Sequence, residues 1–162
     1  MIQVFRVFLL LISIPLVYSC AHVISKDLRI IAQKDIPISD VMKNPDAYIG
    51  NIIIIGGVIA SSINTAEGTY IEVVQKPLDY RGIPKYTDIS YGRFIVLYEG
   101  YLDTAIYSAG REVTVAGEVM GKRIRRLGEM QYPYLLLRSK ELHLFKYRPL
   151  PIKFEIGIWH TF

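Results

Sequence analysis

A single cysteine, Cys20, carries the only thiol of this 162-residue chain. A thiolate is a nucleophile and a metal ligand, but one thiol forms neither an internal disulfide nor a four-cysteine zinc site. Its chemistry therefore requires a second molecule, and its position indicates which kind. Cys20 closely follows an apolar stretch, residues 7–17, which is preceded by Arg6 and contains no acidic residue.

The apolar stretch is too short to cross a membrane as a helix. Its eleven residues would extend about 16 Å, half of the roughly 30 Å of a bilayer core. A positive charge followed by such a stretch is typical of a secretion signal. The residues Leu16-Val17-Tyr18-Ser19-Cys20 resemble the lipobox of bacterial lipoproteins, in which the cysteine thiol receives a thioether-linked diacylglycerol. The alternative is a small buried cysteine that happens to follow an apolar run.

We therefore predict a cleaved signal peptide at residues 1–19 and a lipid anchor, hence a membrane partner, at Cys20. Two or three acyl chains at about 0.8 kcal/mol per buried methylene hold a protein on a membrane firmly. Ala21 follows the cysteine where an Asp would favour the inner membrane, so the resemblance implies the outer membrane of a bacterium with two membranes.

A basic run is the one concentrated charge feature, in a chain of formal net charge +4. Its cations are candidates for binding an anionic envelope component such as lipid phosphate or lipopolysaccharide: Lys122, Arg123, Arg125 and Arg126. The simpler interpretation, which we favour, is a solvated hairpin loop between two strands, with charges that discourage edge-to-edge pairing.

The same run allows a nucleic-acid interpretation. Tyr70, Phe94 and Tyr98 would then lie on one face beside the cations and stack against bases. A secreted lipoprotein rarely meets nucleic acid, so we expect no nucleic-acid partner, and the sequence indicates no particular protein partner.

Catalytic and metal-binding patterns are not found. His22, His143 and His160 are far apart, and none has a metal-ligand spacing. No nucleophile elbow or phosphate loop appears. Acidic residues beside predicted turns are expected to cap backbone amides, and these are Asp79, Asp88, Glu99 and Asp103. We predict no metal, no cofactor and no enzymatic activity, with an envelope hydrolase or metal-dependent enzyme as the alternative.

The elements that position these residues are mostly strands. A composition of 51% hydrophobic and 12% aromatic residues excludes a disordered chain. β-branched or alternating segments predict five strands, and the last of them has a continuation toward Leu144: residues 52–55, 69–74, 93–98, 112–119 and 134–137. We expect Ile52 to Ile55 to be covered on both faces and Gly56-Gly57 to form a bulge or bend.

A short helix, with Ser39 as its cap, is predicted at residues 41–43, followed by a helical turn at 46–48. Residues 77–91, with two prolines and a glycine, read as a long loop. A Gly-x-x-β-x-β-x-Gly-x-β pattern, in which β is Ile or Val, begins at Gly50 and again at Gly110. It predicts two strands that each present an apolar face to the inside of the barrel. In the fourth strand we expect Val113, Val115 and Val119 inside and polar groups outside.

These elements predict a mainly β fold, a small OB-like barrel of five to six strands with a short N-terminal helix. The predicted organisation is a signal peptide at 1–19, a lipid-anchored tether at 20–38, the barrel domain at 39–148 and a C-terminal extension at 149–162. In the extension, alternating apolar residues from Ile152 to Ile158 fit either an edge strand or the export tag of a membrane barrel. We favour the edge strand, because membrane barrels need at least eight strands.

Several segments resemble the Slp family of outer membrane lipoproteins in order and spacing. They include 44–50, 56–59, 68–79, 92–94 and 100–103, and also Gly110-Arg111-Glu112-Val113-Thr114-Val115-Ala116-Gly117-Glu118-Val119-Met120-Gly121. The resemblance implies a starvation- or stress-linked outer membrane lipoprotein, a family with no established enzymatic activity or ligand. We predict a non-enzymatic, periplasm-facing structural or binding module of the envelope. The alternatives are an anion, polysaccharide or nucleic-acid binder that uses an OB-like face, or an envelope hydrolase.

Overall fold

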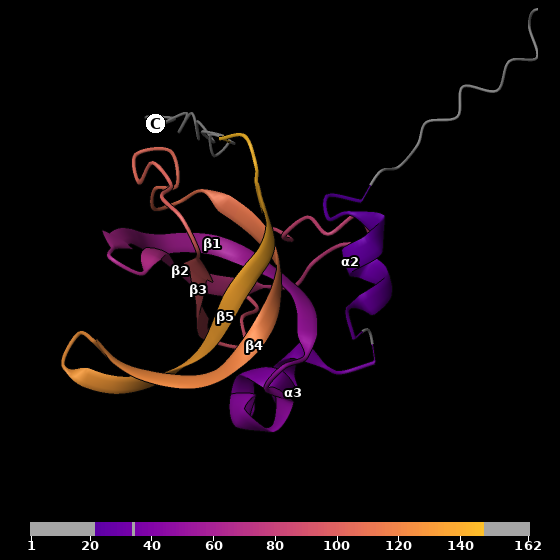
Figure 1. Ribbon diagram of the computed structural model, residues 1–162, viewed down its shortest axis with the longest axis horizontal. Helices are drawn as coiled ribbons and strands as arrows, with labels where there is room; N and C mark the ends of the chain where they lie inside the picture. The colour runs from indigo at the N-terminus through magenta and orange to yellow at the C-terminus, as the bar shows by residue number, and fades with distance from the viewer. Residues whose placement is uncertain (1–21, 34, 148–162) are drawn as a thin grey trace, which may run out of the picture.

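The computed structural model describes residues 22–33 and 35–147, in which five strands close into a barrel (Figure 1). They are β1 (Ile52–Thr65), β2 (Gly68–Lys76), β3 (Arg93–Tyr98), β4 (Glu112–Leu127) and β5 (Met130–Leu144). Around the barrel the order is β1-β2-β3-β5-β4. β3 and β5 pair in parallel, and the other neighbours are antiparallel. The predicted OB-like barrel is confirmed.

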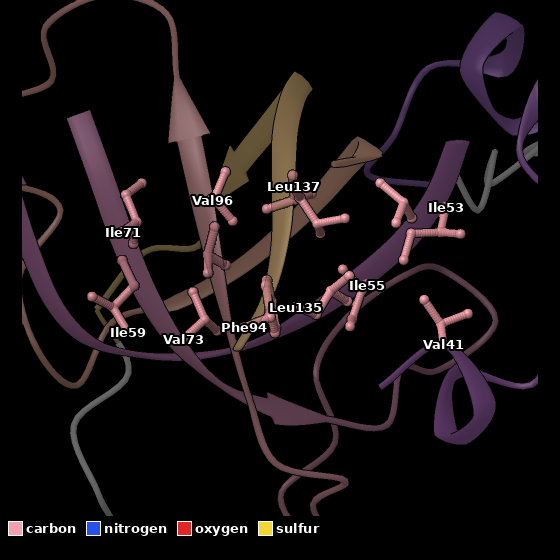
Figure 2. Close-up of a cluster of buried hydrophobic side chains, with 13 residues drawn as sticks. Val41, Ile53, Ile55, Ile59, Ile71, Val73, Phe94, Val96, Leu135 and Leu137 are labelled. Atoms are coloured by element: carbon pink, nitrogen blue, oxygen red, sulfur yellow. The ribbon is translucent and has the colours of Figure 1, made fainter. Parts of the chain in front are cut away.

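The repeated glycine pattern lies on two strands that pair with each other. β1 and β4 are antiparallel neighbours, with Gly57 opposite Val113 and Ile53 opposite Gly117. Their apolar positions point into one buried cluster with residues of β2, β3, β5 and Val41 (Figure 2). Burial of each such side chain stabilises the fold by about 1.5–3 kcal/mol. The predicted inward face of Val113, Val115 and Val119 is confirmed.

Two predictions about the glycines and isoleucines of β1 are corrected. Pairing is continuous through Gly56 and Gly57, and the register shift comes later, between Ile59 and Ser61. Gly57 instead permits close approach of β2, because a Cβ there would lie 1.9 Å from the Val74 carbonyl oxygen. Of the four isoleucines, those at 53 and 55 are buried, and those at 52 and 54 are half-buried.

The outer face of β4 is not the polar, solvated face that alternation predicts. Thr114 is fully buried, and its Oγ1 donates a hydrogen bond of 2.6 Å to the carbonyl oxygen of Gly82. The long loop at 77–91 therefore covers this part of the barrel.

In the described residues, three short helical segments precede the barrel: α2 (Lys26–Ile31), α3 (Ile38–Lys43) and the 3-10 helix η1 (Pro45–Tyr48). α3 begins earlier than predicted, with Pro37 at the cap position and Ser39 inside the helix. α2 lies beside the barrel (Figure 1), and the flanking Ile24 and Ala32 are 1% and 7% exposed. None of the helices in the described ranges has the length and hydropathy of a membrane span.

The lipid-anchor residue Cys20 and the predicted extension at 149–162 lie outside the described residues. The predicted domain boundaries accordingly stay predictions.

Candidate functional site

The four predicted anion-binding residues lie on a strand rather than in a loop. β4 continues to Leu127 and β5 begins at Met130, so residues 120–137 form a long hairpin that we call the β4–β5 arm. The arm reaches out from the barrel on the side away from α2 (Figure 1). Alternation along a strand places Arg123 and Arg125 on one face and Lys122 and Arg126 on the other. The structure thus separates the predicted set into two pairs.

Arg123 and Arg125 both stack on the ring of Tyr70 in β2. Their guanidinium carbons lie 5.4 and 4.8 Å from the ring centroid, which is cation–π geometry. Arg123 Nη1 also donates a hydrogen bond of 3.2 Å to the Tyr70 hydroxyl, which donates in turn to the carboxylate of Glu67. One tyrosine therefore positions both arginines.

Two tyrosines of the arm, Tyr132 and Tyr134, form with Tyr70 an aromatic cluster that we call the aromatic floor. Arg123 pairs with Tyr134 across the hairpin, and Arg125 pairs with Tyr132. The two tyrosine rings meet edge to face, with centroids 4.8 Å apart. Tyr70, Tyr134 and Ile95 of β3 form a second buried cluster outside the barrel. The arm thus packs on the outer face of β2 and β3.

A carboxylate below this floor is already neutralised. Glu72 forms an ion pair of 2.6 Å with Arg93 and accepts a hydrogen bond of 3.1 Å from the Tyr134 hydroxyl. Burial, and next the negative charge of Glu72, raise the pKa of Tyr134, so this phenol stays a donor at neutral pH. Among the described residues, Arg123 and Arg125 have no ion-pair partner. The two guanidinium groups are left available to an anion.

The opposite face of the arm has a different character. Lys122 donates its backbone amide to Asp46 Oδ1 at 2.7 Å, and its Nζ lies 3.6 Å from Asp46 Oδ2. Arg126 is exposed, as is Ile124 between them. Lys122 therefore fixes the base of the arm to η1, and Arg126 is a solvated surface charge.

The predicted aromatic face of Tyr70, Phe94 and Tyr98 is wrong for two of its members. Phe94 is fully buried inside the barrel, and Tyr98 shares its face of β3. Sequence reasoning missed Tyr132 and Tyr134. The signal was the spacing of Arg-Ile-Arg before, and Tyr-Pro-Tyr after, the Gly128-Glu129 turn, which pairs them in a hairpin.

A groove of about 410 Å³ lies between α2 and the 77–91 loop, with Ile36, Ile38, Ile54 and Leu78 among its lining residues. Its polar lining residues include His22, Arg29, Gln33 and Asp79. His22 Nδ1 accepts the Ile24 amide at 3.0 Å, and Arg29 Nε donates to the Ile24 carbonyl oxygen at 3.1 Å. His22 and Arg29 thus help to hold the N-terminal segment.

Burial, followed by the charge of Arg29, lowers the pKa of His22 below its usual value. Asp79 behaves differently. Partial burial opposes its ionisation, but the amides of Ile83 and Arg81 and the Arg81 guanidinium outweigh this and lower its pKa.

The predicted capping role is confirmed for two acidic residues. Asp79 Oδ1 accepts the amides of Arg81 and Ile83 at 2.9 and 2.8 Å, and Asp103 Oδ1 accepts that of Ala105 at 2.8 Å. Glu99 forms an ion pair of 3.0 Å with Arg138, and Asp88 is exposed in the loop.

The histidines are dispersed. His22 lies in the groove, His143 packs edge to face on Phe145 at 4.7 Å, and His160 lies outside the described residues. Within the described ranges, His, Cys, Asp and Glu form no group of three or more that could hold a metal ion.

Comparison with known proteins decides the family. The model of the outer membrane lipoprotein Slp family matches residues 17–156 of this chain. The chain belongs to that family. The resemblance seen in the sequence is thereby confirmed, and the protein is an outer membrane lipoprotein.

Two relatives come from Escherichia coli. The outer membrane protein Slp is 24% identical over 93% of this chain and 80% of its own length. The lipoprotein YeaY is 29% identical over 60% of this chain, and the match spans half of YeaY. An aspartyl-tRNA synthetase structure from Leishmania major matches 74% of this chain and 23% of its own, at 14% identity and a TM-score of 0.41.

Proposed function

We propose that this Slp-family lipoprotein is held on the outer membrane by a diacylglycerol on Cys20, with its barrel in the periplasm. We further propose that it acts as a non-enzymatic binding module of the envelope in stress. The observation that carries the anchor is the family match, which begins at residue 17 and so includes Ser19-Cys20. The thiol of Cys20 is the only side chain of this chain that can take a thioether-linked lipid.

Metabolic labelling with a palmitate analogue tests the anchor. The wild-type chain should be labelled and should float with outer membrane vesicles, and Cys20→Ala should lose both properties. Cys20→Ser is the matched control, because it keeps the size and polarity of the side chain but cannot form the thioether. Labelling of Cys20→Ala at the wild-type level would refute the anchor.

The use of the groove's polar groups supports a non-enzymatic role. His22, Arg29 and Asp79 are each engaged with backbone groups of Ile24, Arg81 or Ile83. The purified lipoprotein should therefore release no product from peptidoglycan or from envelope glycans. Turnover that disappears in Asp79→Asn would overturn this part of the proposal.

The arm favours a more specific binding function, in which Arg123 and Arg125 bind phosphate groups of an anionic envelope polymer. Two guanidinium groups that share one tyrosine ring and have no carboxylate partner among the described residues form such a site. Guanidinium groups bind phosphate oxygens in a bidentate manner. Burial of Tyr70 and Tyr134 holds the two side chains in place.

Titration with purified lipopolysaccharide at two salt concentrations tests this site. Replacing Arg123 and Arg125 with Gln should weaken binding by at least about tenfold, since hydrogen bonds to charged groups contribute about 1.5–3 kcal/mol each. The matched control replaces Lys122 and Arg126 with Gln and should change affinity less. Equal losses in both variants would indicate unspecific charge attraction, and tighter binding of single-stranded DNA would favour the nucleic-acid alternative.

A further inference from the structure

Two segments that lie side by side carry exposed apolar side chains. In α2, Ile30 and Ile31 are 66% and 56% exposed. In the 77–91 loop, Tyr80, Tyr86 and Tyr91 are 77%, 86% and 52% exposed. We call residues 22–31 and 77–91 together the α2 pole. Large side chains exposed to this extent are candidates for contact with a partner.

The two segments of the pole are held together and fixed to the barrel. The Val23 amide donates a hydrogen bond of 3.0 Å to the carbonyl oxygen of Arg81. His22 packs so closely on Gly82 that a Cβ at Gly82 would lie 2.7 Å from the imidazole. The buried Thr114 of β4 binds the Gly82 carbonyl oxygen from below. The pole is therefore an ordered surface, and the buried side chain of Ile24, at 1% exposure, anchors its N-terminal part.

The pole also lies next to the proposed lipid anchor, and the inference rests on that proposed function. Cys20 precedes His22 by two residues, and two residues of chain span at most about 7 Å. Residues 22–33 contact the barrel, since Ile24 is buried and the Gln33 amide donates a hydrogen bond of 2.9 Å to the Ile52 carbonyl oxygen. A diacylglycerol on Cys20 thus brings the neighbouring α2 pole close to the level of the lipid headgroups.

The charges of the pole indicate which kind of lipid headgroup it fits. It contains the cations Lys26, Arg29, Arg81 and Lys85 and the carboxylates Asp27, Asp79 and Asp88. This near balance does not require an anionic surface. Tyrosines with an apolar ring and a polar hydroxyl are the side chains enriched at membrane–water interfaces.

We propose that the α2 pole docks on the surface of zwitterionic phospholipid, with Tyr80, Tyr86 and Ile30 at the depth of the headgroups. Docking adds to the anchor, because a covalent lipid this close makes the contact effectively intramolecular. It also sets the orientation of the barrel. The β4–β5 arm, at the other side of the molecule (Figure 1), then points away from the membrane.

Site-directed spin labelling of the full acylated chain tests this docking. Acylation consumes the only native cysteine, so a cysteine introduced elsewhere takes a nitroxide alone. We choose Tyr86→Cys in the pole and, as the matched control, Tyr101→Cys, since Tyr101 is 73% exposed on the 99–111 loop away from α2 (Figure 1). The protein is reconstituted in vesicles of phosphatidylethanolamine and phosphatidylcholine.

The expected result is a label at 86 that is relaxed by oxygen and protected from a water-soluble nickel complex, and a label at 101 with the reverse accessibilities. In a chain that also carries Tyr80→Ser, the label at 86 should become at least about threefold more accessible to nickel. Added Tyr147→Ser, at an exposed site elsewhere, should leave it unchanged.

Nickel accessibility that is equal at 86 and 101, in protein that still floats with the vesicles, would overturn docking while leaving the anchor intact. Failure to float would instead contradict the proposed anchor. Spin–spin broadening at 86 that persists when the protein is diluted in lipid would also overturn the inference, because it would show that a second copy covers the pole.

Discussion

The α2 pole and the β4–β5 arm use the same residue types in opposite ways. In the pole, the tyrosine rings face solvent, and Arg81, which lies 5.7 Å from the centroid of the Tyr80 ring, forms an ion pair with Asp79. In the arm, Tyr134 is buried at 1% exposure, and Arg123 and Arg125 stack on the buried Tyr70. A count of tyrosines and cations therefore does not predict a binding surface. The proposed lipid-facing and anion-facing surfaces differ in the exposure of their tyrosine rings and in whether a carboxylate pairs with the cations.

The two regions should also differ in how they are stabilised. The arm rests on a second apolar cluster, with Tyr70, Ile95 and Tyr134 buried between the hairpin and the barrel. The pole depends on one buried isoleucine and a few hydrogen bonds at backbone groups, such as Val23 to Arg81. Local opening should therefore be easier at the pole than at the arm.

Tyr134→Ala should give the largest loss of stability in this comparison. Removal of a buried aromatic side chain costs about 3–5 kcal/mol, and here it also removes the support for Arg123. Tyr134→Phe keeps the ring and loses only the hydrogen bond to the Glu72 carboxylate, which, as a bond to a charged group, contributes about 1.5–3 kcal/mol. Denaturant unfolding measures both free energies. If Tyr134→Ala lowered the free energy of unfolding by less than Tyr134→Phe does, the packing of the arm on the barrel would be contradicted.

A pair of glycines with the same backbone conformation isolates the contact in the pole. Gly82 and Gly110 have φ angles of 81° and 87°, but only a Cβ at Gly82 would meet His22, while at Gly110 nothing lies within 4 Å. Substitution by Ala should cost about 1–2 kcal/mol at each site for the left-handed backbone. Hydrogen exchange at the Val23 amide should become faster only in Gly82→Ala. Equal exchange in both variants would show that the N-terminal segment does not depend on this contact.

Local sequence signals predicted the barrel well because its inner face is periodic. Val113, Val115 and Val119 alternate in β4, and the observed face follows that period. The same period places Thr114 on the outer face, but it does not reveal that Gly82, 32 residues away in the chain, covers it. A polar residue that is satisfied by a distant loop looks, in the sequence, like a solvated one.

The candidate site shows the same limit. The sequence identifies the cations at 122–126, but their charge favours a loop. In the structure these residues belong to β4 and pair with the strand that carries Tyr132 and Tyr134, and this pairing depends on tertiary packing. Phe94 was placed on a binding face because alternation gives two faces without saying which is inside. The short Cys20 motif, in contrast, needs no tertiary context to be recognised, and its acylation remains a prediction.

The smallest expected difference between the two regions is their response to pH. Burial, and then Arg29, lower the pKa of His22, although the charges of Asp79 and Glu141 act in the opposite direction. The unfolded segment therefore binds a proton at higher pH than the folded one, so the stability of the pole should fall as pH decreases below the ordinary histidine value of about 6.5. Protonation of Nδ1 would also break the hydrogen bond that it accepts from the Ile24 amide. Tyr134 of the arm, whose pKa is raised, does not titrate in this range.

Hydrogen exchange from pH 7.5 to 5.5 should therefore show protection at Ile24 decreasing relative to the amides of β5. His22→Asn, which keeps an acceptor for the amide two residues on but does not titrate, should remove this pH dependence. A wild-type ratio that is constant across the range would contradict the role of His22 as the weak point of the pole.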